Sequence, residues 1–320
     1  MGVASLMIIA CHASASHVLM PDWLNMVLDY GNVGVDIFLF LSGVGLYYSF
    51  KKTPIQSIIG VKNYLNKRSS RIFIPYWLVY LPYCIVLLLL RQYTIGDSLM
   101  CLGAIEYWFY HRGAWFVSLI LILYLFAPLL FTILNSKFKW IYVLLFIVAI
   151  SIICQLPLGE PHNNNIIYNI QFALSRVPSF IVGMAVGDLC QENKKISSVW
   201  LFLLFVIGLL SIKSFPNRGC AIWMTIPFVL YLILLIIKVL ATNVWINKIL
   251  TFMGIISLES YLTNISINSL LETVVLNPNT SLIFYGKYLQ YIIVISVGIT
   301  AAFFVNRLAK QLTERYLRVS

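Results

Sequence analysis

Four ionisable side chains stand inside long apolar runs of the sequence, where a charge needs a task or a partner. They are His12, Asp36, Arg176 and Glu259. A charge at the centre of a bilayer costs at least about 2.5–3.5 kcal/mol, so such residues mark substrate paths, proton relays or buried ion pairs. His12 is the best suited to acid–base chemistry, because an ordinary imidazole titrates close to neutral pH.

A pair of arginines, Arg68 and Arg71, precedes another apolar run. Their three-residue spacing places both on one face of a helix. Two neighbouring guanidinium groups form a two-pronged grip on a phosphate group. The same pair also fits ordinary basic anchors that hold the end of a span at the lipid headgroups.

Each interior group has a structural interpretation as well. A polar tether between helices would account for His12, and an ion pair with Arg176 would account for Asp36. Glu259 fits a protonated or hydrogen-bonded carboxyl group. These residues alone support an enzyme and a secondary transporter about equally, and a non-catalytic membrane subunit stays open. The sequence has no CxxC pair and no Cys/His cluster, so it predicts neither a metal site nor a disulfide framework.

The composition places these residues in a membrane. The 320-residue chain is 61% hydrophobic and 10% charged, with a mean hydropathy of +0.90. A soluble domain averages about 25% charged residues, so a water-soluble fold and a disordered chain are both excluded. The net charge of +11 lies in short segments between apolar runs, where it sets orientation and meets anionic headgroups or cofactors. We therefore expect membrane lipids, and no nucleic acid, among the partners.

The apolar runs predict an all-α, polytopic transmembrane helical bundle. A transmembrane helix needs about 20 mostly apolar residues, and the runs lack the strict alternation of barrel strands. Residues 1–320 make one integral-membrane domain, and no soluble domain is left over. The ten predicted spans are 1–20, 33–50, 74–90, 115–134, 139–156, 171–188, 198–212, 219–237, 249–270 and 283–305.

The basic residues predict the orientation of the bundle. Sixteen of the 22 Lys and Arg residues fall in one alternate set of connecting segments, five fall in the other set, and Arg176 lies within a span. Segments rich in Lys and Arg stay in the cytoplasm. Both termini are therefore expected in the cytoplasm, with 21–32, 91–114 and 156–170 on the opposite side.

Several local strings carry more information than the composition. After the first span with His12 come G-V-D-x-F-x-x-x-S-G at 34–43 and R-x-x-R-x-x-x-P at 68–75. Together they resemble the opening of the acyltransferase-three family. The string that begins at Trp115 looks like that family's fourth span, and 254–262 looks like its ninth. The resemblance covers essentially the whole chain.

The resemblance implies an integral-membrane enzyme that takes an acyl group, often acetyl, from cytoplasmic acyl-CoA. The acceptor is a hydroxyl of an envelope polysaccharide, a lipid-linked saccharide or a similar molecule, and the expected location is the bacterial cytoplasmic membrane. The donor is acyl-CoA, with no metal. The resemblance assigns His12 as the base that removes the hydroxyl proton, by direct transfer or through an acyl-imidazole.

The remaining assignments follow the family positions. Arg68 and Arg71 would meet the phosphates of coenzyme A. Asp36 would orient the imidazole or an acceptor hydroxyl, or pair with Arg176. We expect Arg176, Glu259, Asn264 and Trp115 to have substrate-binding or structural roles.

Two positions depart from the family pattern. An Arg commonly stands eleven positions before the first-span His, where this chain has Met1. The ninth-span string commonly reaches a His after Tyr-Leu, whereas this chain has Thr263 and then Asn264. An amide can hydrogen-bond but cannot act as a base near neutral pH.

No motif in the sequence identifies the acceptor or the oligomeric state. The aromatic cluster at 107–110 and the Asn163-Asn164-Asn165 run fit contacts with a sugar. They fit an interfacial aromatic belt and a polar loop equally well.

Overall fold

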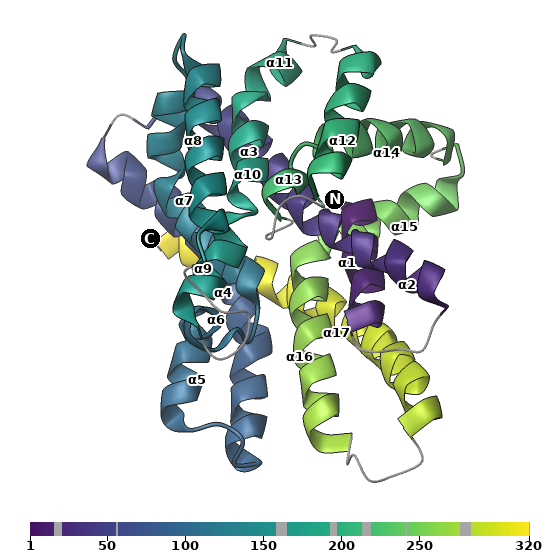
Figure 1. Ribbon diagram of the computed structural model, residues 1–320. Helices are drawn as coiled ribbons and strands as arrows, with labels where there is room; N and C mark the ends of the chain where they lie inside the picture. Colours follow the sequence, from purple (N-terminus) through teal and green to yellow (C-terminus); the bar gives the residue numbers. More distant parts are fainter. Residues whose placement is uncertain are drawn as a thin grey trace.

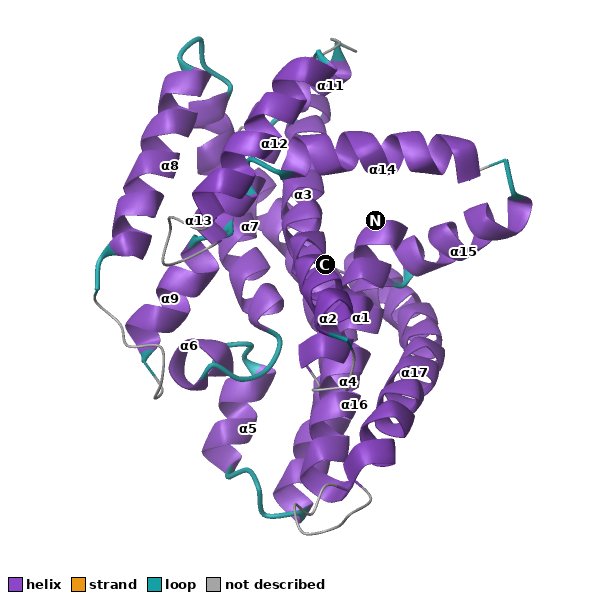
Figure 2. Cartoon of the chain, turned by 45° about the vertical axis from the view of Figure 1, so that its right-hand side comes forward, coloured by secondary structure: helices purple, strands orange, loops and turns teal. Residues whose placement is uncertain are grey.

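The computed structural model describes residues 1–15, 21–55, 57–157, 165–192, 197–212, 219–240, 242–275 and 283–319, so Asn163 and Asn164 lie outside the described residues. The described residues form helices and no strand (Figure 1, Figure 2). This confirms the predicted all-α class. A helix pairs its own backbone donors and acceptors, which is what a chain in lipid requires.

The helices, one of them a short 3₁₀ turn (η1), follow one another along the chain with short connections. In chain order they are α1 (Gly2–Ala15), α2 (Asp22–Asp29), η1 (Tyr30–Asn32), α3 (Val33–Lys52), α4 (Ile58–Leu89), α5 (Ile95–Leu102), α6 (Glu106–Tyr110), α7 (Trp115–Leu134), α8 (Lys139–Gln155), α9 (Ile166–Leu174), α10 (Val177–Ala185), α11 (Gly187–Gln191), α12 (Ser198–Ile212), α13 (Gly219–Ile222), α14 (Ile226–Leu240), α15 (Val244–Ile255), α16 (Ser257–Val275) and α17 (Ile283–Val319).

Among the described residues, four helical stretches are long and apolar enough to cross a membrane: Asp22–Lys52, Ile58–Leu89, Trp115–Leu134 and Tyr291–Arg318. The pair α15 and α16 adds a fifth if it counts as one span bent by 71°. Four further apolar helices are shorter, at 10–17 residues. The chain is therefore an integral-membrane protein, while the total of ten spans and the side of the termini stay predictions.

Three of the predicted spans are divided in the structure. The predicted span 171–188 breaks at Ser175 and Arg176, between α9 and α10. Pro178 follows at the start of α10, where a missing N–H costs the helix nothing. The predicted span 219–237 is split between α13 and α14, and 249–270 is bent at Ile256 between α15 and α16.

Close packing of two helices fixes the centre of the bundle. α3 and α10 lie side by side (Figure 1) and touch at Gly43 and Gly183. A Cβ atom added to Gly43 would lie 2.3 Å from the carbonyl oxygen of Phe180, and one added to Gly183 would lie 2.1 Å from that of Phe40. Only glycine permits this approach, as is common where helices pack in membranes. The contact aligns Asp36 on α3 with the start of α10.

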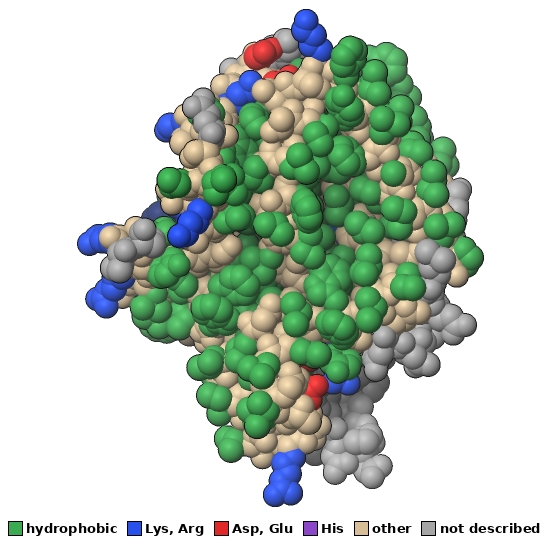
Figure 3. Space-filling view, turned by 90° about the vertical axis from the view of Figure 1, so that its left-hand side faces the viewer, with side chains coloured by type: hydrophobic (Ala, Val, Ile, Leu, Met, Phe, Trp, Pro, Cys, Tyr) green, Lys and Arg blue, Asp and Glu red, His purple; other side chains and the backbone are tan. Residues whose placement is uncertain are grey.

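The outside of the molecule is apolar over a large area. Hydrophobic side chains cover most of the face in Figure 3, whereas Lys and Arg side chains lie toward its edges. On α8, for example, Leu144 and Leu145 are about 60% exposed. A soluble protein rarely leaves so large an apolar surface in water, and lipid is the solvent that suits it.

Candidate active site

His12 lies in the last turn of α1, and its partner is an amide from the other end of the chain. Its Nδ1 atom is 2.6 Å from Oδ1 of Asn264 on α16, which lies 252 residues further along. An amide oxygen only accepts hydrogen bonds, so Nδ1 is the nitrogen that carries the proton. The lone pair of the neutral ring is then on Nε2, which is available as a base.

The bend between α15 and α16 brings Asn264 to His12. α16 begins anew at Ser257 and packs against α1, α4 and α17. From α17, the hydroxyl of Tyr291 donates to the carbonyl oxygen of Ile9, which ties α1 down one turn before His12. Because three helices hold this corner, the imidazole has a defined position.

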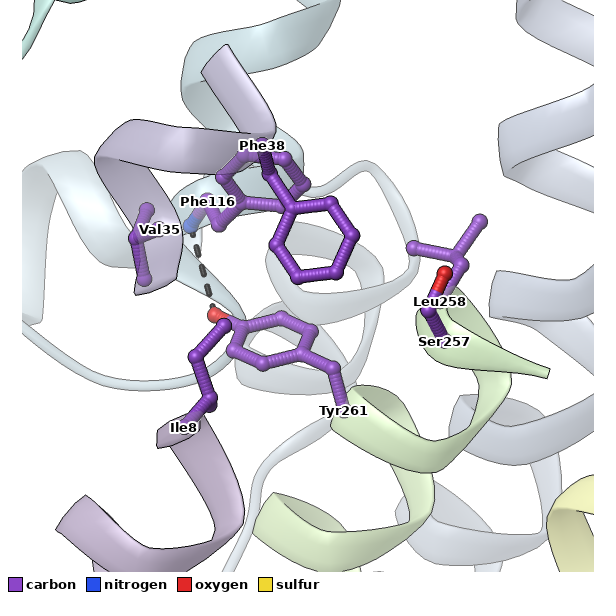
Figure 4. Close-up of a pocket in the computed structure, with 7 residues that line it drawn as sticks. All are labelled: Ile8, Val35, Phe38, Phe116, Ser257, Leu258 and Tyr261. Atoms are coloured by element: carbon purple, nitrogen blue, oxygen red, sulfur yellow. Dashed lines mark hydrogen bonds between the residues drawn. The ribbon is translucent and has the colours of Figure 1, made fainter. Parts of the chain in front are cut away.

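The imidazole lines one small space, and a second space adjoins the first. The first, about 10 Å³, is lined by His12 and six neighbours and has room for about one water-sized group. The second, about 50 Å³, shares Ile8, Ser257 and Tyr261 with the first and is mainly apolar (Figure 4). The Tyr261 hydroxyl accepts a hydrogen bond from the backbone N–H of Phe116 at 3.4 Å, which places the phenol between α16 and α7.

Asp36 and Arg176 form a buried ion pair. Arg176 Nη1 is 2.5 Å from Asp36 Oδ2, and the Ser179 hydroxyl donates to Oδ1 at 2.8 Å. Asp36 is completely buried. The guanidinium also lies 5.6 Å from the centre of the Phe172 ring. Both carboxylate oxygens of Asp36 accept hydrogen bonds. Of the roles considered for Asp36 from the sequence, the structure therefore has the ion pair with Arg176.

The second carboxylate within a span is also hydrogen-bonded. Glu259, in the first turn of α16, accepts from Nδ2 of Asn306 on α17 at 2.9 Å. Trp115, at the start of α7, packs edge-on against Phe172 with the ring centres 5.2 Å apart. Neither of these residues shares a hydrogen bond with His12 among the described residues.

Arg68 and Arg71 lie on α4, and neither lines the two small cavities described above. The Arg68 guanidinium is half-buried and lies 5.8 Å from the centre of the Tyr124 ring on α7. Arg71 is exposed. In the part of the chain that the structure describes, neither arginine forms a salt bridge, so both are available to an anion.

Sequence reasoning named His12 and Asn264 but did not join them, and it missed Ser179, Tyr261 and Asn306. Ser179 had a local signal, because it follows Arg176 by three residues and shares its helical face. Asn306 had none beyond being an amide in an apolar run. In the described ranges, no three His, Cys, Asp or Glu side chains come together as metal ligands would.

One comparison with known proteins is positive. A family model described as an acyltransferase domain matches residues 2–307. No curated protein and no solved structure match the chain. The matched range includes every residue described above for the candidate site.

Proposed function

The chain belongs to the acyltransferase-three family, and from this premise we propose that it is a membrane-embedded O-acyltransferase. The donor is acyl-CoA, with acetyl as the acyl group, and the acceptor is a hydroxyl of an envelope polysaccharide or a lipid-linked saccharide. The observation that carries the proposal is the His12–Asn264 pair, because it leaves a base at Nε2 inside the bundle.

The proposed reaction uses the imidazole as a general base. Nε2 takes the proton of the acceptor hydroxyl while the oxygen attacks the thioester carbonyl carbon. The C–S bond breaks, the sulfur of CoA leaves with the electron pair, and the imidazolium returns the proton to it. An alcohol is a poor nucleophile near neutral pH, so this proton transfer contributes about 100- to 10,000-fold to the rate. A route through an acyl-imidazole would use the same nitrogen.

Asn264 has the role of a positioning residue in this proposal. A base that is oriented by a third group is a recurring arrangement in enzymes with an activated nucleophile. The amide oxygen holds the Nδ1 proton and so selects the tautomer with a basic Nε2. This positioning role needs only a hydrogen-bond acceptor, so an amide can fill it although an amide is not a base.

We expect Asn264→Ala to lower the rate of acetyl transfer about tenfold, which corresponds to the loss of one hydrogen bond of about 1.4 kcal/mol. Asn264→Gln is the matched variant, because it keeps the amide on a longer side chain. The measurement is radiolabelled acetyl transfer in membranes at several pH values, normalised to the amount of protein. Equal rates in the wild type and Asn264→Ala would show that Asn264 does not position the base.

The donor path is supported by the arrangement along α7. Arg68 lies at Tyr124, whereas Phe116, eight residues earlier, borders the apolar cavity beside His12. At 1.5 Å per residue the two positions are about 12 Å apart along the helix. In the proposal, a coenzyme A held by its phosphates at Arg68 and Arg71 extends its pantetheine arm toward that cavity.

We expect Arg68→Ala with Arg71→Ala to raise the KM for acetyl-CoA about tenfold or more, because two charge-assisted hydrogen bonds to phosphate are lost. Lys62→Ala is the control, since it removes an exposed positive charge from another face of α4. Initial rates at varied acetyl-CoA concentration give the KM. If Lys62→Ala raised the KM by the same factor, the effect would come from general surface charge and not from a phosphate site at Arg68 and Arg71.

Location and topology complete the proposal. We propose the bacterial cytoplasmic membrane, ten spans and cytoplasmic termini, on the support of the basic residues described above. Transfer of radiolabelled acetyl to the envelope fraction tests the function directly. Solute flux into proteoliposomes without any acyl donor, together with no transfer, would favour a transporter instead.

A further inference from the structure

The apolar cavity of about 50 Å³ is enclosed by residues of four helices (Figure 4). They are Ile8 from α1, Val35 and Phe38 from α3, Phe116 from α7, and Ser257, Leu258 and Tyr261 from α16. Ile8, Ser257 and Tyr261 also line the smaller space at His12. A group that fills the apolar cavity therefore borders the space at the imidazole.

The lining of the apolar cavity suits a short hydrocarbon group. Most of the lining side chains are aliphatic or aromatic, and among them Ser257 and Tyr261 alone bring a hydroxyl. The Tyr261 hydroxyl already accepts a hydrogen bond from the backbone N–H of Phe116. A sugar ring or a phosphate group would lose its water here without enough new partners. A hydrocarbon group loses no hydrogen bond and gains by leaving water.

The size of the apolar cavity limits the length of such a group. One water-sized group needs about 10–15 Å³ of cavity, so a cavity of 50 Å³ holds about three to five of them. An acetyl group consists of a methyl, a carbonyl carbon and a carbonyl oxygen, and it fits this space. A hexanoyl group carries several further methylenes and exceeds it.

Close backbone packing fixes one wall of the apolar cavity. α1 and α3 meet at Gly34, where an added Cβ atom would lie 2.6 Å from the carbonyl oxygen of Ala4 and 2.9 Å from Cγ1 of Ile8. Ile8 and Val35, which line the cavity from these two helices, are both buried. Because the helices already touch, this wall cannot recede to admit a longer chain.

A row of aromatic rings forms another wall. The ring centres of Phe38 and Phe116 lie 6.4 Å apart, and those of Phe116 and Tyr261 lie 5.8 Å apart. These are the separations of aromatic rings in contact. The hydrogen bond to Tyr261 comes from the backbone of Phe116, so it does not depend on the Phe116 ring. The Phe38 and Phe116 rings can therefore be removed while the tether of Tyr261 stays.

We propose that Phe38 and Phe116 determine the length of acyl chain that the protein accepts, with the apolar cavity as the seat of the acyl group. The carbonyl carbon of that group then lies on the side that the two spaces share, toward His12. The identity of the donor as acyl-CoA rests on the proposed function, whereas the length limit rests on the size and the walls of the cavity.

The length limit is tested first by binding, in the absence of an acceptor. Acetyl-CoA, butyryl-CoA and hexanoyl-CoA are titrated against the purified full-length protein. A longer tail would raise the affinity if it simply left water for protein or detergent, so weaker binding marks a size limit. We expect hexanoyl-CoA to bind the wild type at least about tenfold more weakly than acetyl-CoA, because surplus methylenes are rejected by a closed pocket.

Removal of one ring should relax this limit. We expect Phe116→Ala to raise the affinity for hexanoyl-CoA relative to acetyl-CoA about tenfold or more, and Phe38→Ala to act in the same direction. Phe116→Leu, a smaller change, keeps the test decisive if the alanine variant does not fold. Phe126→Ala is the matched control, because it removes the same ring from α7 at a side chain that is 51% exposed and lines neither small cavity. Its ratio of affinities should equal that of the wild type.

The same preference is then measured as acyl transfer. The value of kcat/KM for hexanoyl-CoA divided by that for acetyl-CoA is a ratio within one preparation, so neither the amount of protein nor the strength of the base changes it. We expect this ratio to rise in Phe38→Ala and Phe116→Ala and to stay constant in Phe126→Ala. An unchanged ratio in both cavity variants, or equal affinity of the wild type for acetyl-CoA and hexanoyl-CoA, would overturn the proposal.

The length limit and the proposed function fail in different ways. Length-dependent binding that changes in Phe116→Ala, together with no transfer from any donor, would overturn the proposed function and keep the cavity as an acyl site. Transfer that depends on His12 but runs equally fast from all three thioesters would overturn the length limit and keep the enzyme.

Discussion

We expect His12→Ala to lower acetyl transfer from acetyl-CoA about 100- to 10,000-fold, the range that a general base contributes. Among the described residues that line the small cavity around the imidazole, no other group can replace it. The polar side chains that share its small cavity are Ser5, Ser257, Tyr261 and Asn264, and none of these types is a base near neutral pH. The measurement is incorporation of radiolabelled acetyl into the envelope fraction, with the variant protein quantified in the same membranes.

A second histidine provides the control for this variant. His111 also contacts an asparagine, with its Nδ1 atom 2.6 Å from Oδ1 of Asn169. It lies after α6 and lines neither of the two small cavities beside His12. We expect His111→Ala to keep most of the transfer activity, which separates loss of the base from loss of a helix tether. Undiminished transfer in His12→Ala at normal abundance would reject His12 as the base.

We expect Asp36→Ala to destabilise the protein by about 3–5 kcal/mol, because it leaves the buried guanidinium of Arg176 without its counter-ion. The Ser179 hydroxyl would lose its acceptor as well. The effect should appear as a lower unfolding temperature of the purified protein and as a lower yield from membranes.

The paired variant separates a structural from a chemical role. Asp36→Ala with Arg176→Ala removes both charges and should recover part of the lost stability, because no unpaired charge then remains buried. Asp36→Asn keeps one acceptor oxygen, which can face Arg176, and places an amide N–H at the side of Ser179, whose hydroxyl can turn to accept from it. If Asp36→Asn folds normally and yet loses acetyl transfer, Asp36 takes part in the chemistry. A single variant Asp36→Ala as stable as the wild type would contradict the importance of the ion pair.

Much of the helical structure was predictable because it depends on local properties. The predicted span 115–134 coincides with α7, and 139–156 differs from α8 by one residue. Apolar length and flanking polar residues decide such helices, and both are visible in the chain itself. The breaks were predictable only in part. Pro178 marks the start of α10, but the bend at Ile256 has no proline or glycine at the bend itself.

The candidate site was predictable residue by residue but not as an arrangement. The type and depth of His12 in an apolar run already indicated a base or a tether. The resemblance suggested Arg68 and Arg71 as phosphate ligands, and that role stays a prediction.

Composition and short motifs identify this chain as a helical membrane protein of the acyltransferase-three family, because both are properties of neighbouring residues. The pairing of Asn264 with His12, and of Asp36 with Arg176 and Ser179, depends instead on how distant helices pack. Those pairs join positions more than 100 residues apart. Which faces of two helices meet depends on close approaches such as Gly43 with Gly183, and on bends such as that at Ile256, which involve the whole bundle.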